Sequence, residues 1–213
     1  DSFAKIFNDG FTAAAELGYE LYTIIETEDV VNITWFEQAI SYIAEKEDTS
    51  IFAPLTKQSV NGVFSGFMNE ASWVEKMAEQ PGYFDMALLT QYNAISPLGA
   101  IYKVEGVKEF TQEKDGRYMP FKESMKLTNS YEFFLRMIYN DLKVTTIPRI
   151  GYEIRMINSK YVPTSSKAPQ NLASLPADQG GMAESEIKFY LELAKKEYFF
   201  DEDRNKVYEQ PVS

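Results

Sequence analysis

A single stretch constrains the fold of this chain more than any other: a β-rich apolar run that ends in polar residues and leads into an amphipathic helix. The run Tyr19 to Ile25 (YELYTII) has the composition of a buried strand, which Glu26 to Asp29 ends. A Thr-x-x-Glu capping pair then opens a segment with apolar residues at helical spacing, which predicts a helix from about Thr34 to Lys46. A second strand is predicted at Ser50 to Leu55. This succession indicates an α/β fold in which helices flank a mixed sheet.

The same patterns divide the rest of the chain. Helical spacing predicts that Phe36, Ile40 and Ile43 lie on the buried face of the Thr34 to Lys46 helix. The other predicted elements are, in chain order, a helix from residue 3, a loop at 57–66, a short helix after Asn69, strands at 84–89 and 99–104, a helix at 130–140, and strands at 144–147 and 152–156.

The last part of the chain differs in composition. Ser, Pro, Ala, Gln and Gly dominate residues 158–182, which predicts an extended linker. A final helix is predicted from Glu184 to Phe200, and it must dock on the main body or on another protein because an isolated helix of this length is marginal in water. We therefore predict an α/β domain at 1–157, a linker at 158–182, and a C-terminal helix and tail at 183–213.

Composition limits the chemistry that the chain can perform. Its 213 residues include no Cys and no His, which excludes Ser-His-Asp triads, thiol nucleophiles, iron–sulfur clusters and His or Cys zinc sites. Any bound metal is therefore a hard cation with oxygen ligands. The net charge of -11 argues against nucleic acid as a partner. No apolar run approaches the ~18 residues of a membrane span and no signal peptide is visible, so we expect a soluble, cytoplasmic protein.

The acidic residues that end the first predicted strand are the leading candidates for a functional site. Alternation along an extended segment puts Glu26 and Glu28 on the same side, and ligands of α/β sheets bind beyond the carboxyl ends of strands. Together with Asp29, these carboxylates are suited to a divalent ion that bridges to substrate phosphates. The alternative is that all three are solvated residues of a strand-to-helix loop, with Asp29 favoured by the N-terminus of the next helix.

Several short segments follow one another in an order that points to a known family. Asn8-Asp9-Gly10 lies on a predicted helix, and the strand after it ends in Glu26-Thr27-Glu28-Asp29. The further segments are Ile95 to Tyr102, Asp115 to Ser124, Asn129 to Arg136, and Lys143 to Arg155. In this order they resemble the Asn-x-Gly, the Asp-x-Asp motif, the acceptor-side strand, the Gly-x-Phe-Asp-Glu segment, the Glu-Asp-Tyr-Glu helix start and the closing strands of family 2 glycosyltransferases with the GT-A fold.

This resemblance implies a GT-A-like, Rossmann-like fold and a reaction. Enzymes of the family transfer a sugar from a nucleotide-sugar to an acceptor hydroxyl, and the resemblance implies that Mn or Mg assists. It places Asn8 and Gly10 near the nucleotide, and Glu26, Glu28 and Asp29 at the metal.

The chain departs from the family at two functional positions. The metal motif has Glu where the family has Asp, which moves each carboxylate one methylene farther from the backbone. Asn129-Ser130 stands where the family has the Glu-Asp pair that supplies the catalytic base, and neither is a useful base near neutral pH. The catalytic residue is therefore unassigned, with Glu123 and Glu132 as possible replacements.

Two functions remain open at this point. The first is a metal-assisted glycosyltransferase whose partners are a nucleotide-sugar and a glycan or other hydroxyl acceptor. The second is a GT-A-like domain that has lost catalysis and serves as a binding or assembly module. The family's nucleoside-binding strands precede the segment that resembles this chain, so we expect the sheet to be incomplete on its N-terminal side. Upstream polypeptide or a second chain is then expected to pack against Tyr19 to Ile25.

Overall fold

A mixed sheet forms the centre of the computed structural model, which describes residues 2–71, 80–84, 89, 95–113, 115–125 and 129–156. The strands are β1 (Leu21–Thr23), β2 (Val30–Val31), β3 (Thr49–Val60), β4 (Val63–Met68), β5 (Ile101–Lys103) and β6 (Lys143–Met156). Their order is β1-β5-β3-β6-β2, and β4 pairs with β3 beside this path. β3 and β6 pair in parallel, and the other strand pairs are antiparallel. The mixed α/β fold predicted from the sequence is confirmed.

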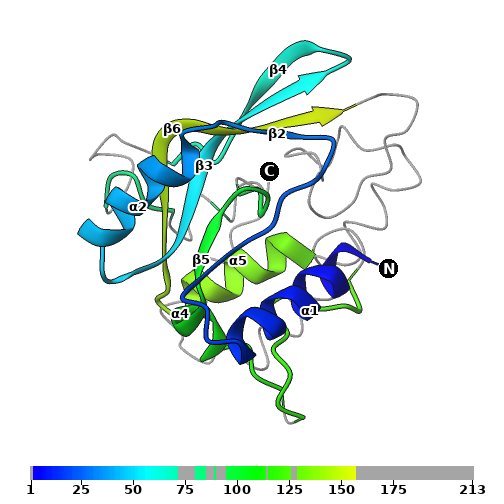
Figure 1. The fold of residues 1–213 in the computed structure, drawn as a ribbon, viewed down its shortest axis with the longest axis vertical. Helices are drawn as coiled ribbons and strands as arrows, with labels where there is room; N and C mark the ends of the chain where they lie inside the picture. The colour runs from blue at the N-terminus through cyan, green and yellow to red at the C-terminus, as the bar shows by residue number, and fades with distance from the viewer. Residues whose placement is uncertain are drawn as a thin grey trace, which may run out of the picture.

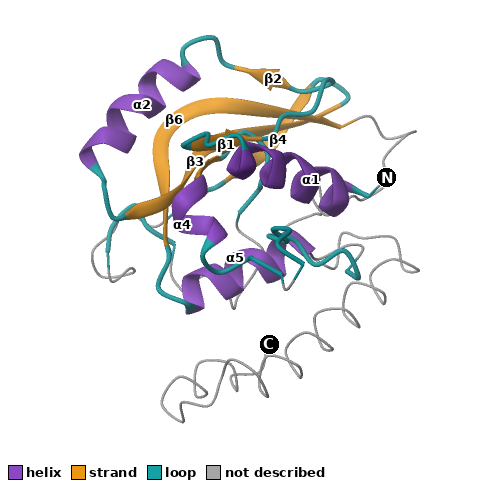
Figure 2. Cartoon of the chain, turned by 60° about the horizontal axis from the view of Figure 1, so that its bottom comes forward, coloured by secondary structure: helices purple, strands orange, loops and turns teal. Residues whose placement is uncertain are grey.

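Helices cover both faces of the sheet. α2 (Trp35–Glu45) lies on one face, whereas α1 (Phe3–Glu16), α4 (Val104–Lys108) and α5 (Asn129–Tyr139) lie on the other, as Figures 1 and 2 show. Side chains of β3 alternate between the two layers. Ile51 and Ala53 join the larger core with α1 and α5, and Phe52 joins a smaller core with α2.

The strand predicted at Ser50 to Leu55 is longer than expected. β3 continues to Val60 and forms a hairpin with β4, so the prediction of a loop at 57–66 is wrong. Asn61 and Gly62 make the tight turn with φ angles of 51° and 78°, a conformation that Asn-Gly pairs favour. Pro54 does not end β3 because the pairing with β6 shifts register there, at a point where a missing N–H is tolerated.

The later predictions are closer to the structure. β5 and α5 lie where a strand at 99–104 and a helix at 130–140 were predicted. The two strands predicted at 144–147 and 152–156 are one long strand, β6, that passes through Pro148.

The buried face of α2 is rotated relative to the prediction. Phe36 and Ile40 are 40% and 59% exposed, so their predicted burial is wrong, whereas Ile43 packs partly against the smaller core. Trp35 and Ala39 are buried instead. The larger Trp35 ring gains more from burial than Phe36 does, and its position sets the rotation of the helix.

Two glycines explain where the Trp35 ring lies. A Cβ atom on Gly151 of β6 would be 2.5 Å from the indole ring, so only glycine admits this approach. Indole Nε1–H donates to the carbonyl oxygen of Gly99 at 3.0 Å. Trp35 therefore ties α2 to β6 and to the segment before β5.

The first strand is shorter than predicted. Tyr19 to Ile25 contributes only the three residues of β1, which pair with β5. Among the strands that the structure describes, no other pairs with β1, which therefore stands at an edge of the described sheet. Whether upstream polypeptide covers this edge stays a prediction.

Several predicted elements lie outside the residues that the structure describes. The helix after Asn69, the strand at 84–89, and the linker and helix after residue 157 fall largely or wholly outside the described residues. None of the helices in the described ranges combines the length and apolarity that crossing a bilayer requires.

Candidate functional site

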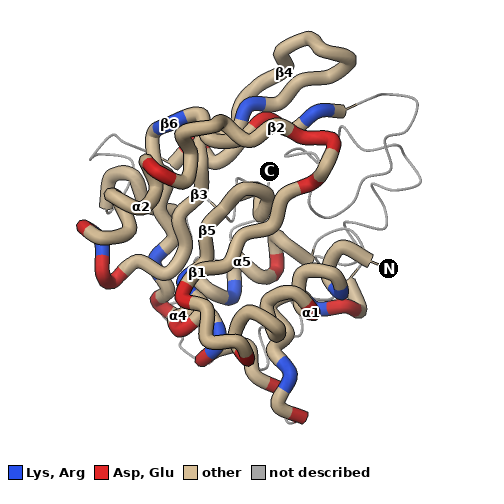
Figure 3. Tube along the Cα trace, viewed as in Figure 1, with Lys and Arg blue, Asp and Glu red and all other residues tan. Residues whose placement is uncertain are grey.

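The connection from β1 to β2 carries the acidic residues predicted to bind a metal, and red segments mark them in Figure 3. The Asp29 N–H donates to the Glu26 carbonyl at 3.2 Å, which closes a turn over residues 26–29, hereafter the acidic turn. The Tyr152 hydroxyl accepts a hydrogen bond from the Glu26 N–H and donates one to Asp29 Oδ2, both at 2.9 Å. Asp29 Oδ1 accepts from the Arg155 N–H at 2.9 Å. Residues of β6 therefore hold both ends of the acidic turn.

Tyr152 is itself held firmly. Its side chain is buried, and a Cβ atom on Gly99 would lie 2.6 Å from its ring, so the ring packs directly on the glycine backbone. Gly99 has a φ of +71°, a conformation that glycine adopts without strain, and its N–H donates to Ile24 just before the acidic turn. Burial raises the pKa of the Tyr152 hydroxyl well above its usual value, and the charge of Asp29 adds to this, so the hydroxyl keeps the proton that it donates.

The three carboxylates of the acidic turn differ in exposure. Glu28 is exposed, whereas Glu26 and Asp29 are partly buried. The described ranges contain no group of three or more acidic side chains placed to hold a metal. Magnesium commonly takes one or two protein carboxylates and completes its shell with water and substrate phosphates, and the exposed Glu28 is a carboxylate of the required kind. The metal roles of Glu26, Glu28 and Asp29 stay predictions.

A second charged group lies beside the acidic turn, where β2 pairs with β6. Glu153 of β6 is opposite Val30 and accepts a hydrogen bond from Ser59 at 2.9 Å. Lys57 contributes an ion pair at 3.3 Å. The Ser59 hydrogen bond, followed by the contact with Lys57, lowers the pKa of Glu153, which keeps this carboxylate charged.

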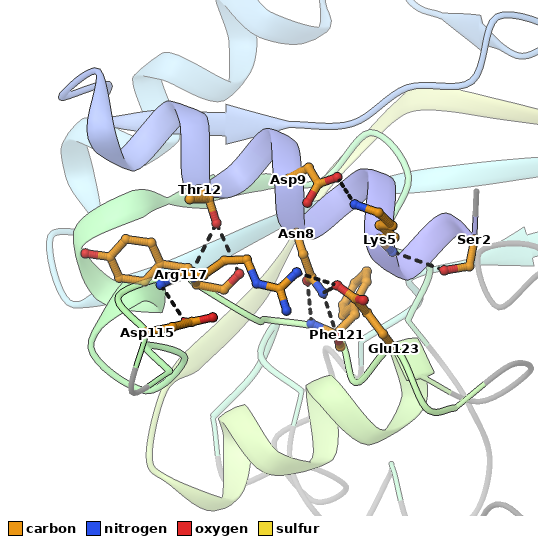
Figure 4. Close-up of polar contacts among 10 residues, drawn as sticks. Ser2, Lys5, Asn8, Asp9, Thr12, Asp115, Arg117, Phe121 and Glu123 are labelled. Carbon is orange, nitrogen blue, oxygen red and sulfur yellow. Dashed lines mark hydrogen bonds and ion pairs between the residues drawn. The ribbon is translucent and has the colours of Figure 1, made fainter.

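Asn8 and Gly10, predicted to lie near a nucleotide, make contacts within the protein. The buried Asn8 amide donates to the Phe121 carbonyl at 2.8 Å and to Glu123 at 3.2 Å, and accepts from the Phe121 N–H at 3.0 Å, as Figure 4 shows. A Cβ atom on Gly10 would lie 2.7 Å from the Tyr22 hydroxyl oxygen. Both residues hold α1 against its neighbours, and no described contact supports the nucleotide role, which stays a prediction.

The start of α5, where the family has its catalytic base, is buried. Asn129 and Ser130 are 2% and 0% exposed. Glu132 is also buried and accepts from Arg136 Nε at 2.8 Å, with Lys122 Nζ at 3.4 Å. Arg136 donates in addition to the Pro120 carbonyl. Glu132 is thereby enclosed in the interior by two cations.

Glu123, the other candidate base, also has partners. It pairs with Arg117 at 3.3 Å and accepts from Asn8 (Figure 4). Neither Glu123 nor Glu132 therefore supplies a free base in the described structure.

The sequence located the acidic turn but not the side chain that anchors it. Tyr152 and Arg155 belong to the segment that resembles the closing strands of the family, and the sequence pattern assigns neither of them a role. Two glycines gave the available signal, because Gly99 and Gly151 both lie where an aromatic ring approaches the backbone. These glycines indicate an approaching aromatic ring only when the pairing of β6 with its neighbouring strands is known.

The fold resembles that of a known glycosyltransferase. The chain is similar to TarS of S. aureus, a glycosyltransferase with a GT-A fold, at a TM-score of 0.51 and 15% sequence identity. The match covers 73% of this chain and 24% of the TarS chain, so this chain spans about a quarter of that protein. No protein family and no curated protein sequence matches the chain. At this identity the similarity shows a shared fold alone.

Proposed function

We propose that this chain forms part of a glycosyltransferase that moves a sugar from a nucleotide-sugar to an acceptor hydroxyl with the help of Mn or Mg. The observation that carries the proposal is the acidic turn, which β6 holds at the end of β1 in a fold shared with a glycosyltransferase. Membership of family 2, which the sequence motifs suggest, is part of the same proposal.

The residues of the acidic turn would act on the nucleotide end of the donor. Glu28, with Glu26, would supply carboxylate oxygens to a divalent ion that also contacts the diphosphate. Such an ion, when bound, neutralises the charge of the departing nucleoside diphosphate. The hydrogen bonds from Tyr152 and Arg155 would keep the acidic turn in place when the ligand binds.

One observation supports a second candidate function. Asn129 and Ser130 stand where the family has the Glu-Asp pair that supplies the catalytic base, and Glu123 and Glu132 are both engaged in ion pairs. A domain built this way is able to bind a nucleotide-sugar without a base to activate the acceptor. The second candidate is therefore a GT-A-like binding or assembly module.

We also propose that upstream polypeptide or a second chain pairs with the outer edge of β1. Within the described residues β1 pairs only with β5, and the buried Thr23 hydroxyl has no hydrogen-bond partner. Tyr19 and Ile25, each two residues beyond an end of β1, are 62% and 50% exposed. Hydrogen exchange on the full-length protein tests this: peptide 19–25 should be as protected as peptides of β3. Exchange as fast as in exposed loops would refute the pairing.

Turnover of nucleotide-sugars by the full-length protein tests the proposed activity. Release of nucleoside diphosphate from a panel of UDP-, GDP- and dTDP-sugars should require Mn or Mg and should stop when a chelator is added. Glu28→Gln should reduce release at least about tenfold, the effect of ~1.4 kcal/mol. Glu37→Gln, at an exposed site on α2, is the matched control and should retain activity. Metal-dependent binding without release in any acceptor mixture would favour the binding module instead.

A further inference from the structure

The Tyr152 hydroxyl contacts both ends of the acidic turn. It accepts from the backbone N–H of Glu26 and donates to the side chain of Asp29, each at 2.9 Å. One hydroxyl therefore fixes the backbone at the beginning of the turn and the carboxylate at its end. A shift of the Tyr152 ring would move both.

The carboxylate of Asp29 is directed toward β6. Its Oδ2 accepts from the Tyr152 hydroxyl, and its Oδ1 accepts from the Arg155 N–H. Hydrogen bonds to a charged carboxylate are among the stronger ones in proteins. β2 begins at the next residue and pairs Val30 with Glu153 and Val31 with Tyr152, which continues the attachment. Asp29 therefore works as an internal anchor of the turn.

Glu28 is in a different position. It is exposed, and within the described residues no hydrogen bond or ion pair involves its carboxylate. Glu28 adjoins Asp29, so the hydrogen bonds of Asp29 to β6 fix the position of the backbone from which the Glu28 side chain extends. A carboxylate that is exposed on a fixed backbone is available to a ligand that arrives from solvent.

We propose that Tyr152 is a positioning residue of the metal–diphosphate site, acting through Asp29, and that Glu28 rather than Asp29 is the carboxylate that meets the ion. This inference rests on the proposed function. Groups that orient a ligating residue from behind commonly affect metal affinity by about 10–100-fold. Loss of the Tyr152 hydroxyl should therefore weaken metal-coupled binding while leaving the exposed carboxylate in the chain.

Tyr152→Phe is the decisive variant because it keeps the ring against Gly99 and removes only the hydroxyl. Tyr83→Phe is its matched control: the Tyr83 hydroxyl also has two partners, Lys46 and Thr49, but Tyr83 bridges to Thr145 near the opposite end of β6. Calorimetry on the full-length protein, at a temperature where circular dichroism shows every variant folded, would measure UDP, GDP and dTDP binding with Mn and with a chelator. Tyr152→Phe should weaken Mn-coupled binding about tenfold, and Tyr83→Phe should not change it.

Thermal unfolding without any ligand gives an independent readout. Tyr152→Phe should lower the midpoint less in an Asp29→Asn background than in the wild type, because the two groups share one hydrogen bond. Its effect should be the same in a Glu28→Gln background as in the wild type. Equal effects in all three backgrounds would overturn the anchoring role of Asp29.

The results separate this inference from the proposed function. Wild-type protein that binds none of the nucleotides with Mn would refute the proposed function and, with it, the positioning role. Wild-type binding that Tyr152→Phe leaves unchanged would overturn this inference alone. Asp29→Asn that abolishes Mn-coupled binding without a change in the unfolding midpoint would make Asp29 a ligand and contradict the division of roles.

Discussion

The acidic turn and the start of α5 are the two regions where the family resemblance places chemistry, and they use charge differently. In the acidic turn, Asp29 is anchored and Glu28 remains exposed. At α5, Glu132 is buried between Arg136 and Lys122, and its carboxylate forms ion pairs with both inside the protein. The difference is that the acidic turn presents an exposed carboxylate, whereas the carboxylate at the start of α5 is enclosed by cations in the interior.

The largest effect should come from the α5 region. Arg136→Met leaves Glu132 buried with Lys122 as its remaining cation, and breaking a buried ion pair costs about 3–5 kcal/mol. Chemical denaturation measures this loss. Lys5→Met, which removes an exposed pair with Asp9, is the control and should cost less than ~1 kcal/mol.

A double variant sharpens this prediction. Replacing Glu132 and Arg136 together by Met removes both charges, and it should be less destabilising than Arg136→Met alone. A double variant that is worse than the single one would mean that the network stabilises the fold in its own right.

The next effect concerns the packing behind the acidic turn. Gly99→Ala places a methyl group 2.6 Å from the Tyr152 ring, and overpacking of this kind costs about 1–3 kcal/mol, in addition to strain at a φ of +71°. Gly18→Ala is the matched control, because Gly18 has a φ of +75° but nothing within 4 Å. Thermal unfolding should show a clearly larger loss at Gly99. Equal losses of stability for Gly99→Ala and Gly18→Ala would mean that the Tyr152 ring moves to accommodate the added methyl group and does not fix the acidic turn.

The smallest effect is the pH dependence of the charged group beside the acidic turn. The folded pKa of Glu153 is lowered, first by Ser59, so its contribution is present above the unfolded pKa and is lost as pH falls through the folded value. Ser59→Ala should cost less than ~1 kcal/mol at pH 7. Its difference from the wild type should shrink below pH ~4. Ser65→Ala, at an exposed site on β4, should show no such pH dependence, and a constant difference for Ser59→Ala would contradict the assignment.

The sequence predicted element types better than it predicted their ends and faces. The helices at α2 and α5 and the strand at β5 were found because their periodicity is local. The rotation of α2 was missed, since Phe36 and Trp35 are both apolar and only contact with Gly151 decides which ring is buried. Asn61-Gly62 between the two strands is a strong signal for the β3–β4 hairpin, where we predicted a loop.

For the candidate site, the sequence located the acidic residues but did not show that Asp29 is hydrogen-bonded to β6 whereas Glu28 is exposed. Glu28 and Asp29 are adjacent and chemically alike, and a pattern in the chain cannot distinguish them. What distinguishes them is Tyr152, 123 residues farther along the chain from Asp29, whose hydroxyl reaches one carboxylate and not the other. Asn8 shows the same limit, because its partner Phe121 is 113 residues away. Long-range contacts of this kind depend on the completed sheet.

Calorimetry of Mn binding to the full-length protein, with and without a nucleoside diphosphate, tests the central claim most directly. Mn should bind more tightly when UDP, GDP or dTDP is present, because the phosphates supply the remaining oxygen ligands. Glu28→Gln, which keeps the shape and removes one charge, should weaken this coupled binding about tenfold, ~1.4 kcal/mol, while thermal unfolding stays within ~0.5 kcal/mol of the wild type. Coupled binding that is absent in the wild type, or equally tight in Glu28→Gln, would contradict the assignment of the acidic turn as the metal–diphosphate site.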